Sequence, residues 1–206
     1  MKRMLALGMG CALMFATRAA HAEHLLNFDK DKAGQPPQGW ETRDDAWRVV
    51  DEPQAPSKPH VLMPPQTVLA AGGLDHLWVS SSAFVNGSVG VRFRTQQESP
   101  AVFGLLWGGT AAEFAEVQIN TQSNSVMVAT THNGKTKLAN QETIVFTPNT
   151  WHLLQVMSLA KQTVVYLDGE IVLTATTPLR KTPGAVGLSV TPNAPLQFDD
   201  FAWRAQ

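Results

Sequence analysis

Two neighbouring aspartates, Asp199 and Asp200, lie in the apolar segment LQFDDFAW near the end of the chain, residues 196–203. The segment has the composition of a β-strand, and successive side chains of a strand point to opposite faces of its sheet. At least one carboxylate is therefore expected to face apolar surroundings, where an unpaired charge is strongly unfavourable. Such a group must do chemistry, bind a cation or fix the chain end through hydrogen bonds. The sequence favours the last two.

A structural calcium ion is one partner that these aspartates can take. We expect the first and last strands of the fold to pair, which would bring Asp29 near Asp199 and Asp200. Carboxylate oxygens are hard ligands of the kind that Ca²⁺ prefers. We therefore treat Asp29, Asp199 and Asp200 as a candidate calcium site, with backbone hydrogen bonds that lock the terminus as the alternative.

A polar array on one sheet provides the candidate ligand-binding surface. Alternation places Val91 and Val117 toward a core and their neighbours toward solvent. We expect the outward residues to share one sheet face, where charged and amide groups suit sugar hydroxyls or a carboxylate, and a tryptophan at the strand end offers an aromatic platform. An ordinary solvated face with cross-strand ion pairs is the alternative. The predicted ligand-binding residues are Arg92, Arg94, Trp107, Glu116 and Gln118.

The sequence assigns no catalytic residue. Glycosidases that use two carboxylates need both acids in one cleft, and alternate positions on a strand achieve this. Glu113 and Glu116 are three residues apart and so face opposite sides of a strand. Acids drawn from different strands stay possible.

Other catalytic and metal motifs are also absent from the sequence. The five histidines after residue 22 occur singly, without the spacing of a zinc site. We interpret His152, at a predicted strand start, as a structural residue. The chain has no G-x-S-x-G elbow, P-loop or dinucleotide fingerprint.

Alternation of apolar and polar residues predicts the elements that position these groups. Asn86–Gly87, Asn133–Gly134 and Asp168–Gly169 separate some of the segments and suit tight hairpin turns. No segment shows helical periodicity. About a dozen short strands therefore predict an all-β fold of two packed antiparallel sheets, a β-sandwich or jelly roll. The alternating segments are 76–84, 89–94, 114–119, 151–159, 163–169, 170–176 and 185–190.

The first 22 residues have the pattern of a secretory signal peptide. Lys2 and Arg3 precede an apolar run that is too short to span a membrane, and Ala20-His21-Ala22 supplies small residues before a cleavage point. We expect a mature chain of residues 23–206, exported to the periplasm or the extracellular space. The single cysteine, Cys11, lies within the signal and lacks the usual lipoprotein context, so we do not expect lipidation.

The mature chain fits one domain. Removing Lys2, Arg3 and Arg18 leaves 13 basic against 17 acidic residues. This weakly acidic balance, without basic runs, argues against nucleic acid or an anionic membrane as partner. No membrane segment is expected after signal cleavage. About 184 residues suffice for one well-buried domain and are few for two.

A series of motifs carries a family resemblance that spans Phe28 to Trp203. The segments NTWHLLQV, VVYLDGEIV, GAVGLSV and FDDFAW follow one another in an order that resembles the secreted concanavalin-A-like, laminin-G-like jelly rolls. The order also resembles that of the bacterial set grouped with 3-keto-disaccharide hydrolase domains. Members of that group place an arginine and an aspartate, then an asparagine and tyrosines, where this chain has LLWGGTAAEFAEVQIN at 105–120. That arginine is missing here.

Two functions follow from these observations. We expect an exported carbohydrate-binding or envelope-interaction module without catalysis, because the chain lacks an acid pair and carries a polar sheet face. Its partner would be a glycan or another envelope component. The alternative is a glycoside-processing hydrolase of the 3-keto-disaccharide type, which the resemblance implies.

Overall fold

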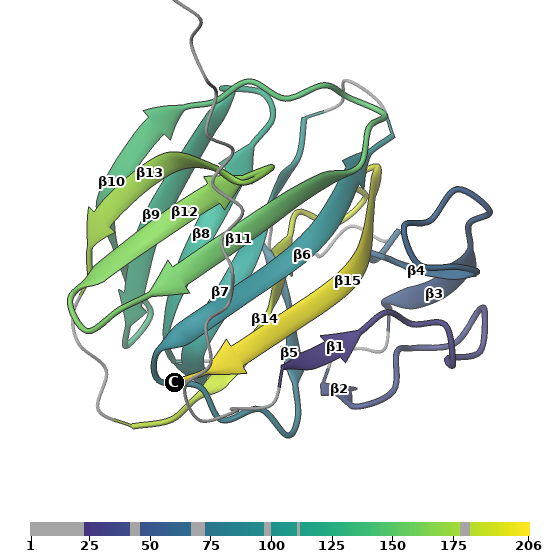
Figure 1. Ribbon diagram of the computed structural model, residues 1–206, viewed down its shortest axis with the longest axis horizontal. Helices are drawn as coiled ribbons and strands as arrows, with labels where there is room; N and C mark the ends of the chain where they lie inside the picture. The colour runs from purple at the N-terminus through teal and green to yellow at the C-terminus, as the bar shows by residue number, and fades with distance from the viewer. Residues whose placement is uncertain (1–22, 42–45, 67–72, 97–99, 111, 178–181) are drawn as a thin grey trace, which may run out of the picture.

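A computed structural model describes residues 23–41, 46–66, 73–96, 100–110, 112–177 and 182–206. These residues form two antiparallel β-sheets packed face to face (Figure 1). The described ranges contain no helix, and thus none that is long and apolar enough to cross a membrane. The predicted all-β sandwich is confirmed. The predicted signal peptide, residues 1–22 with Cys11, lies outside the described residues.

The first sheet has eight strands in the order β13-β12-β11-β6-β15-β4-β3, and β1 pairs with β15. Every pairing in it is antiparallel. Its strands are β1 (His24–Leu26), β3 (Arg48–Asp51), β4 (His60–Met63), β6 (Gly87–Thr95), β11 (His152–Ser158), β12 (Gln162–Leu167), β13 (Glu170–Thr176) and β15 (Leu196–Ala205).

The second sheet has seven strands in the order β10-β9-β8-β7-β14-β5-β2. All of its pairings are antiparallel as well. Its strands are β2 (Trp40–Glu41), β5 (Asp75–Val79), β7 (Val102–Thr110), β8 (Glu113–Asn120), β9 (Ser125–His132), β10 (Lys135–Thr143) and β14 (Ala185–Val190).

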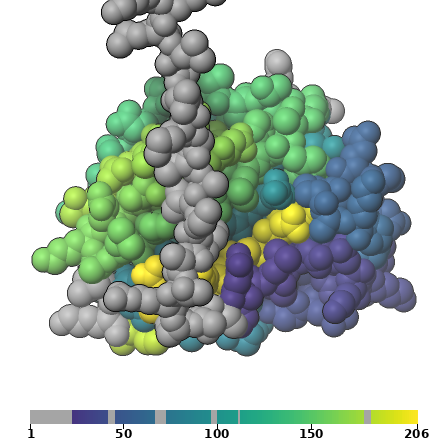
Figure 2. All heavy atoms as spheres, viewed as in Figure 1, coloured from purple at the N-terminus to yellow at the C-terminus, as the bar shows by residue number. Residues whose placement is uncertain are grey.

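The first and last strands pair, as the sequence predicts. Leu26 lies opposite Phe201, and His24 lies opposite Trp203, with their rings stacked at a centroid distance of 4.5 Å. In the space-filling view the purple N-terminal part of the described chain lies beside yellow β15 (Figure 2). Both ends of the described part of the chain, from β1 to β15, thus belong to the same sheet.

The core consists of the side chains that each sheet turns toward the other. Phe103 of β7 contacts Phe93 of β6 at a ring distance of 4.7 Å and Phe198 of β15 at 6.0 Å. All three rings are fully buried. This aromatic group joins the centres of the two sheets, because β6 and β15 are neighbours in the first sheet and β7 is central in the second.

Two of the three expected turn dipeptides form hairpin turns. Asn133–Gly134 and Asp168–Gly169 all have positive φ, between 50° and 85°, the backbone that two-residue hairpins require. Gly87 instead begins β6. A Cβ there would lie 1.9 Å from the carbonyl oxygen of Arg204 on β15, so the close approach of the two strands requires glycine.

The segment that contains both aspartates departs from strict alternation. Phe198 and Phe201 are both fully buried, although they are three residues apart. The register against β6 shifts between Asp199 and Ala202, and Asp200 has a φ of 48°. This β-bulge adds one residue, so both phenylalanines reach the core and neither aspartate does. Strict alternation along the sequence predicts that Asp199 shares a face with Phe201, and the bulge makes that prediction wrong.

Truncation of the central aromatic group should weaken the whole sandwich. We expect Phe103→Ala to lower the free energy of unfolding by about 3 to 5 kcal/mol, the usual cost of removing a fully buried phenylalanine ring. Urea unfolding followed by tryptophan fluorescence measures the change. Val145→Ala is the control, because Val145 is 90% exposed. Equal effects of the two substitutions would contradict this description of the core.

Candidate functional site

The predicted ligand-binding residues belong to both sheets. Arg92 and Arg94 lie on β6 in the first sheet, whereas Glu116 and Gln118 lie on β8 in the second. All four point away from the core, but on opposite sides of the sandwich, since the two strands belong to different layers. The expectation that they share one sheet face is therefore wrong.

Trp107 is not available as an aromatic platform. Its side chain is 2% exposed and belongs to the core cluster. The outward position next to it on β7 is held by Leu106, which is also buried. Seven of the nine residues of β7 are buried, so this strand is covered on both faces. Apolar residues therefore occur at consecutive positions, and alternation does not predict which way Trp107 points.

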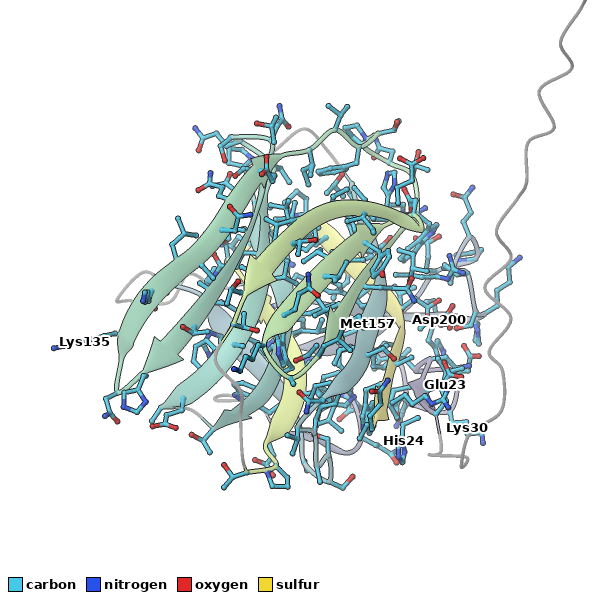
Figure 3. The ribbon with its side chains drawn as sticks, turned by 60° about the vertical axis from the view of Figure 1, so that its left-hand side comes forward. Glu23, His24, Lys30, Lys135, Met157 and Asp200 are labelled. Carbon is cyan, nitrogen blue, oxygen red and sulfur yellow. The ribbon has the colours of Figure 1, made fainter. Side chains whose placement is uncertain are left out.

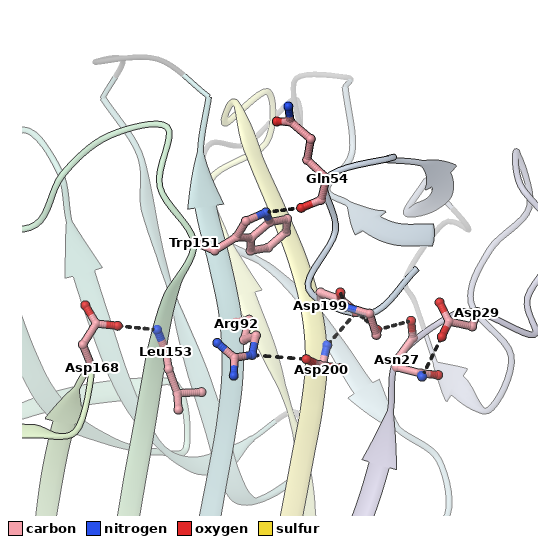
Figure 4. Close-up of polar contacts among 10 residues, drawn as sticks. Asn27, Asp29, Gln54, Arg92, Trp151, Leu153, Asp168, Asp199 and Asp200 are labelled. Carbon is pink, nitrogen blue, oxygen red and sulfur yellow. Dashed lines mark hydrogen bonds and ion pairs between the residues drawn. The ribbon is translucent and has the colours of Figure 1, made fainter. Parts of the chain in front are cut away.

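The arginines of the first sheet hold a loop in place. Arg94 pairs with Glu52 and hydrogen-bonds to Gln197, and its guanidinium lies over the ring of Trp151 at 5.0 Å. The indole N–H of Trp151 in turn donates to the carbonyl oxygen of Gln54 at 3.1 Å (Figure 4). The segment from Glu52 onward is thus fastened across the outer face of this sheet.

Asp199 fastens the same loop further along. Its carboxylate accepts hydrogen bonds from the backbone N–H and the hydroxyl of Ser57, both at 2.9 Å, and from the N–H of Asp200 at 2.8 Å (Figure 4). Asp199 is fully buried, and burial raises the pKa of its carboxyl to about 6, against the effect of the Ser57 hydrogen bonds. The carboxylate ties the last strand to residues that lie more than 100 positions earlier.

The three aspartates of the candidate calcium site are not brought together. Asp200 turns to Arg92, whose Nε lies 3.2 Å from the carboxylate. Asp29 accepts a hydrogen bond from Asn27 at 2.8 Å, and its other oxygen is buried without a partner. Within the described ranges, no group of three or more His, Cys, Asp or Glu side chains is placed to hold a metal ion. The structure shows the hydrogen-bonded alternative for Asp199, and calcium stays a prediction.

His152 has the structural role expected of it. One ring nitrogen lies 2.7 Å from the carboxylate of Asp168, and the other lies 2.8 Å from the carbonyl oxygen of Thr147. The second carboxylate oxygen of Asp168 accepts the backbone N–H of Leu153 (Figure 4). Both ring nitrogens are engaged, so this buried histidine fixes the start of β11 next to the 168–169 turn.

The outer face of the second sheet carries a buried carboxylate. Glu116 is 3% exposed, and its only polar partner among the described residues is Gln118, whose amide nitrogen lies 2.6 Å from the carboxylate. Burial raises the pKa of Glu116, and the hydrogen bond from Gln118 acts in the opposite direction. A carboxyl with a single neutral partner keeps lone pairs for further hydrogen bonds.

Three aromatic rings lie on the same face. The ring of Phe114, on β8, is 5.1 Å from His76 and 5.9 Å from Trp78, both on β5. All contacts are edge-on, with interplanar angles of 65° to 84°. These side chains meet above β14 and β7, the two strands that separate β5 from β8.

Glycines provide the space for this contact. A Cβ on Gly187 of β14 would lie 3.1 Å from the Trp78 ring, and a Cβ on Gly109 of β7 would lie 2.9 Å from it. The indole thus lies directly over backbone. Ser189 on the same strand as Gly187 is fully buried, and its hydroxyl has no hydrogen-bond partner within the described ranges. We call His76, Trp78, Phe114, Glu116, Gln118 and Ser189 the outer-face site.

The sequence analysis identified only two members of this site. His76, Trp78 and Ser189 lie in segments that it assigned to strands, and their alternation with Leu77, Val79 and Leu188 marks them as outward-facing. The missing information was that β14 lies between β7 and β5. That order comes from pairings between residues more than 70 positions apart.

No protein-family model matches this chain, and no curated protein sequence matches it. Its fold does match solved structures. A carbohydrate-binding module, CBM66 from Bacillus subtilis, is similar with a TM-score of 0.61 and 14% identity over 82% of this chain and 96% of that chain. A prokaryotic β-1,3-1,4-glucanase from a mouse hindgut metagenome is similar with a TM-score of 0.58 and 14% identity, over 89% and 99%. The Crh5 transglycosylase is similar with a TM-score of 0.61 and 14% identity, over 91% and 85%.

The raised pKa of Asp199 predicts a pH dependence of stability. The folded state binds this proton more tightly than the unfolded chain, whose ordinary value is 3.8. The stabilisation is complete below pH 4 and is lost as the pH rises through about 6. Asp199→Asn should therefore show a smaller fall in unfolding free energy between pH 4 and 7 than the wild type, by up to about 3 kcal/mol.

Urea titrations at several pH values test this expectation. Asparagine cannot accept hydrogen bonds at both carboxylate positions, so a constant, pH-independent loss is also expected. Only the difference in slope reports the titration. If the wild type instead gains stability relative to the variant as the pH rises from 4 to 7, the hydrogen bonds from Ser57 outweigh burial.

Proposed function

Because the chain has the concanavalin-A-like jelly-roll fold, we propose that it is an exported carbohydrate-binding module that binds its glycan at the outer-face site. The observation that carries the proposal is the combination, on one face, of aromatic rings with a buried carboxylate and amide pair. The structural relatives described as a carbohydrate-binding module, a glucanase and a transglycosylase support the ligand class.

The chemistry of the site matches that of a sugar. Aromatic rings pack well against the apolar face of a pyranose and present little conformational freedom to lose. Glu116 and Gln118 supply acceptors and donors for hydroxyl groups. The hydroxyl of Ser189 has no partner among the described residues, which is unfavourable for a fully buried polar group.

Binding without catalysis agrees with the distribution of buried acids. Among the described residues, the buried carboxylates are those of Asp75, Glu116 and Asp199. Asp75 accepts the indole N–H of Trp47 at 2.8 Å, and Asp199 lies on the other sheet. Among the described residues, Glu116 thus has no second buried carboxylate on its own face that could act as its partner in two-carboxylate hydrolysis.

One observation favours the hydrolase as a second candidate. The raised pKa of Glu116 is a property of general acids, which must hold a proton near the working pH. A glycoside-processing hydrolase of the 3-keto-disaccharide type would use this residue. Such an enzyme would draw its remaining groups from several strands around Glu116.

Substitution of the central tryptophan tests glycan binding. After a glycan array has identified a ligand, we expect Trp78→Ala to raise its Kd at least about tenfold, because a ring contact and its burial are lost. Gln118→Ala should raise it as well. Arg92→Ala is the matched control on the opposite sheet and should leave the Kd unchanged. Melting temperatures verify that each variant is folded.

Two results would contradict the proposal. Glycan affinity that falls in Arg92→Ala and not in Trp78→Ala would assign binding to the first sheet. Hydrolysis of a glycoside by the wild type, lost in Glu116→Gln with binding retained, would establish the hydrolase instead.

A further inference from the structure

A groove runs along one side of the sandwich, where the edge strand of each sheet faces the other. β10 ends the second sheet and β13 ends the first. The amide of Asn140 bridges them, donating to the carbonyl oxygen of Thr174 at 2.8 Å. Beside this bridge lies a cavity of about 450 Å³. The residues that matter for its chemistry are Thr130, Lys137, Leu138, Lys161, Thr176 and Thr177.

Two lysines approach the groove from opposite sheets. Lys137 belongs to β10, and Lys161 immediately precedes β12. Both are exposed, and neither takes part in any of the ion pairs among the described residues. Two ammonium groups at one cavity attract an anion more than either does alone, because their potentials add.

The acidic residues of the same edge strands lie far from the groove. Glu142 follows Lys137 by five residues on β10, and Glu170 precedes Thr176 by six on β13. At about 3.3 Å per residue, each carboxylate is roughly 15 to 20 Å along the strand from the groove. The groove is therefore locally basic, although the chain as a whole is weakly acidic.

The groove also offers hydroxyl and apolar contacts. Thr130 and Thr176 add hydroxyl groups, and Thr177 is buried with its hydroxyl bonded to that of Thr163 at 2.9 Å. Leu138 is 51% exposed and provides an apolar surface on β10, whose other residues are mostly polar. Ammonium, hydroxyl and methyl groups together match a sugar ring that carries a negative charge.

We propose that this groove is a second binding site, specific for an acidic saccharide whose carboxylate lies between Lys137 and Lys161 and whose ring packs on Leu138. The inference does not rest on the outer-face site, which is built from β5, β8 and β14. It adds a preference for negatively charged ligands, which the carboxyl group of Glu116 at the outer-face site does not supply.

Calorimetric titration of the mature chain with a defined oligogalacturonate tests the proposal. The same oligosaccharide with every carboxylate methyl-esterified is the neutral comparison. We expect the acidic form to bind at least about tenfold more tightly, and Lys137→Gln combined with Lys161→Gln to remove that advantage. Raising the salt concentration should reduce the advantage too, because exposed charges are screened.

Lys135→Gln is the matched control. Lys135 lies on the same strand, two residues before Lys137, and projects from its end into solvent (Figure 3). It does not line the groove. The variant that replaces Lys137 and Lys161 by arginine should keep the preference for the acidic form. A loss in Lys135→Gln equal to that in the double variant would show a general charge effect and overturn the proposal.

The remaining outcomes separate the two sites. Equal affinity for the acidic and neutral forms, with Trp78→Ala weakening both, would refute the groove and retain the outer-face site. A preference for the acidic form that depends on the lysines and not on Trp78 would support the groove and refute the outer-face site for this ligand. Inorganic phosphate that competes as well as the oligogalacturonate would mean a site for free anions, not for a saccharide.

Discussion

Burial of one side of each sheet in a common core is the constraint from which the rest of the molecule follows. The aromatic contact of Phe103 with Phe93 and Phe198 joins the two layers at their centres. Every strand that contributes inward side chains must then turn its alternate residues outward. The sandwich therefore has two outer faces, and the polar and charged side chains of its strands are divided between them.

The two outer faces have different uses. On the first sheet, these charged groups contact other parts of the chain. Arg94 and Asp199 hold the loop that begins at Glu52, and Arg92 pairs with Asp200. On the second sheet, glycines leave room for aromatic rings, and Glu116 keeps only one polar partner. Charged residues on a strand therefore indicate an anchored loop as readily as a ligand site. Which of the two is present depends on whether another segment of the chain covers the charged residues.

The sequence predicts the fold well because alternation is a local property of each strand. The turns at 133–134 and 168–169 are predicted for the same reason. The pairing of β1 with β15 is not local and was expected only from the jelly-roll class, whose first and last strands commonly pair. Alternation does not predict which strands are neighbours. For this reason Arg92 and Glu116 were expected on one sheet, although they lie on different sheets. The bulge at Asp200 escapes it as well, because one inserted residue reverses the direction of each following side chain without changing composition. Trp107 lies in a strand covered on both faces, where periodicity carries no information.

The arrangement at the side of the sandwich also bears on the pairing of one copy of the chain with another. Within the described part of the chain, β10 and β13 each have one edge without a paired strand, and such edges can offer backbone groups to other molecules. Lys135 and Lys137 place charge on that edge of β10, and an added strand from another copy would have to desolvate both ammonium groups. The same side chains that make the groove basic thus discourage the growth of a sheet from one molecule to the next.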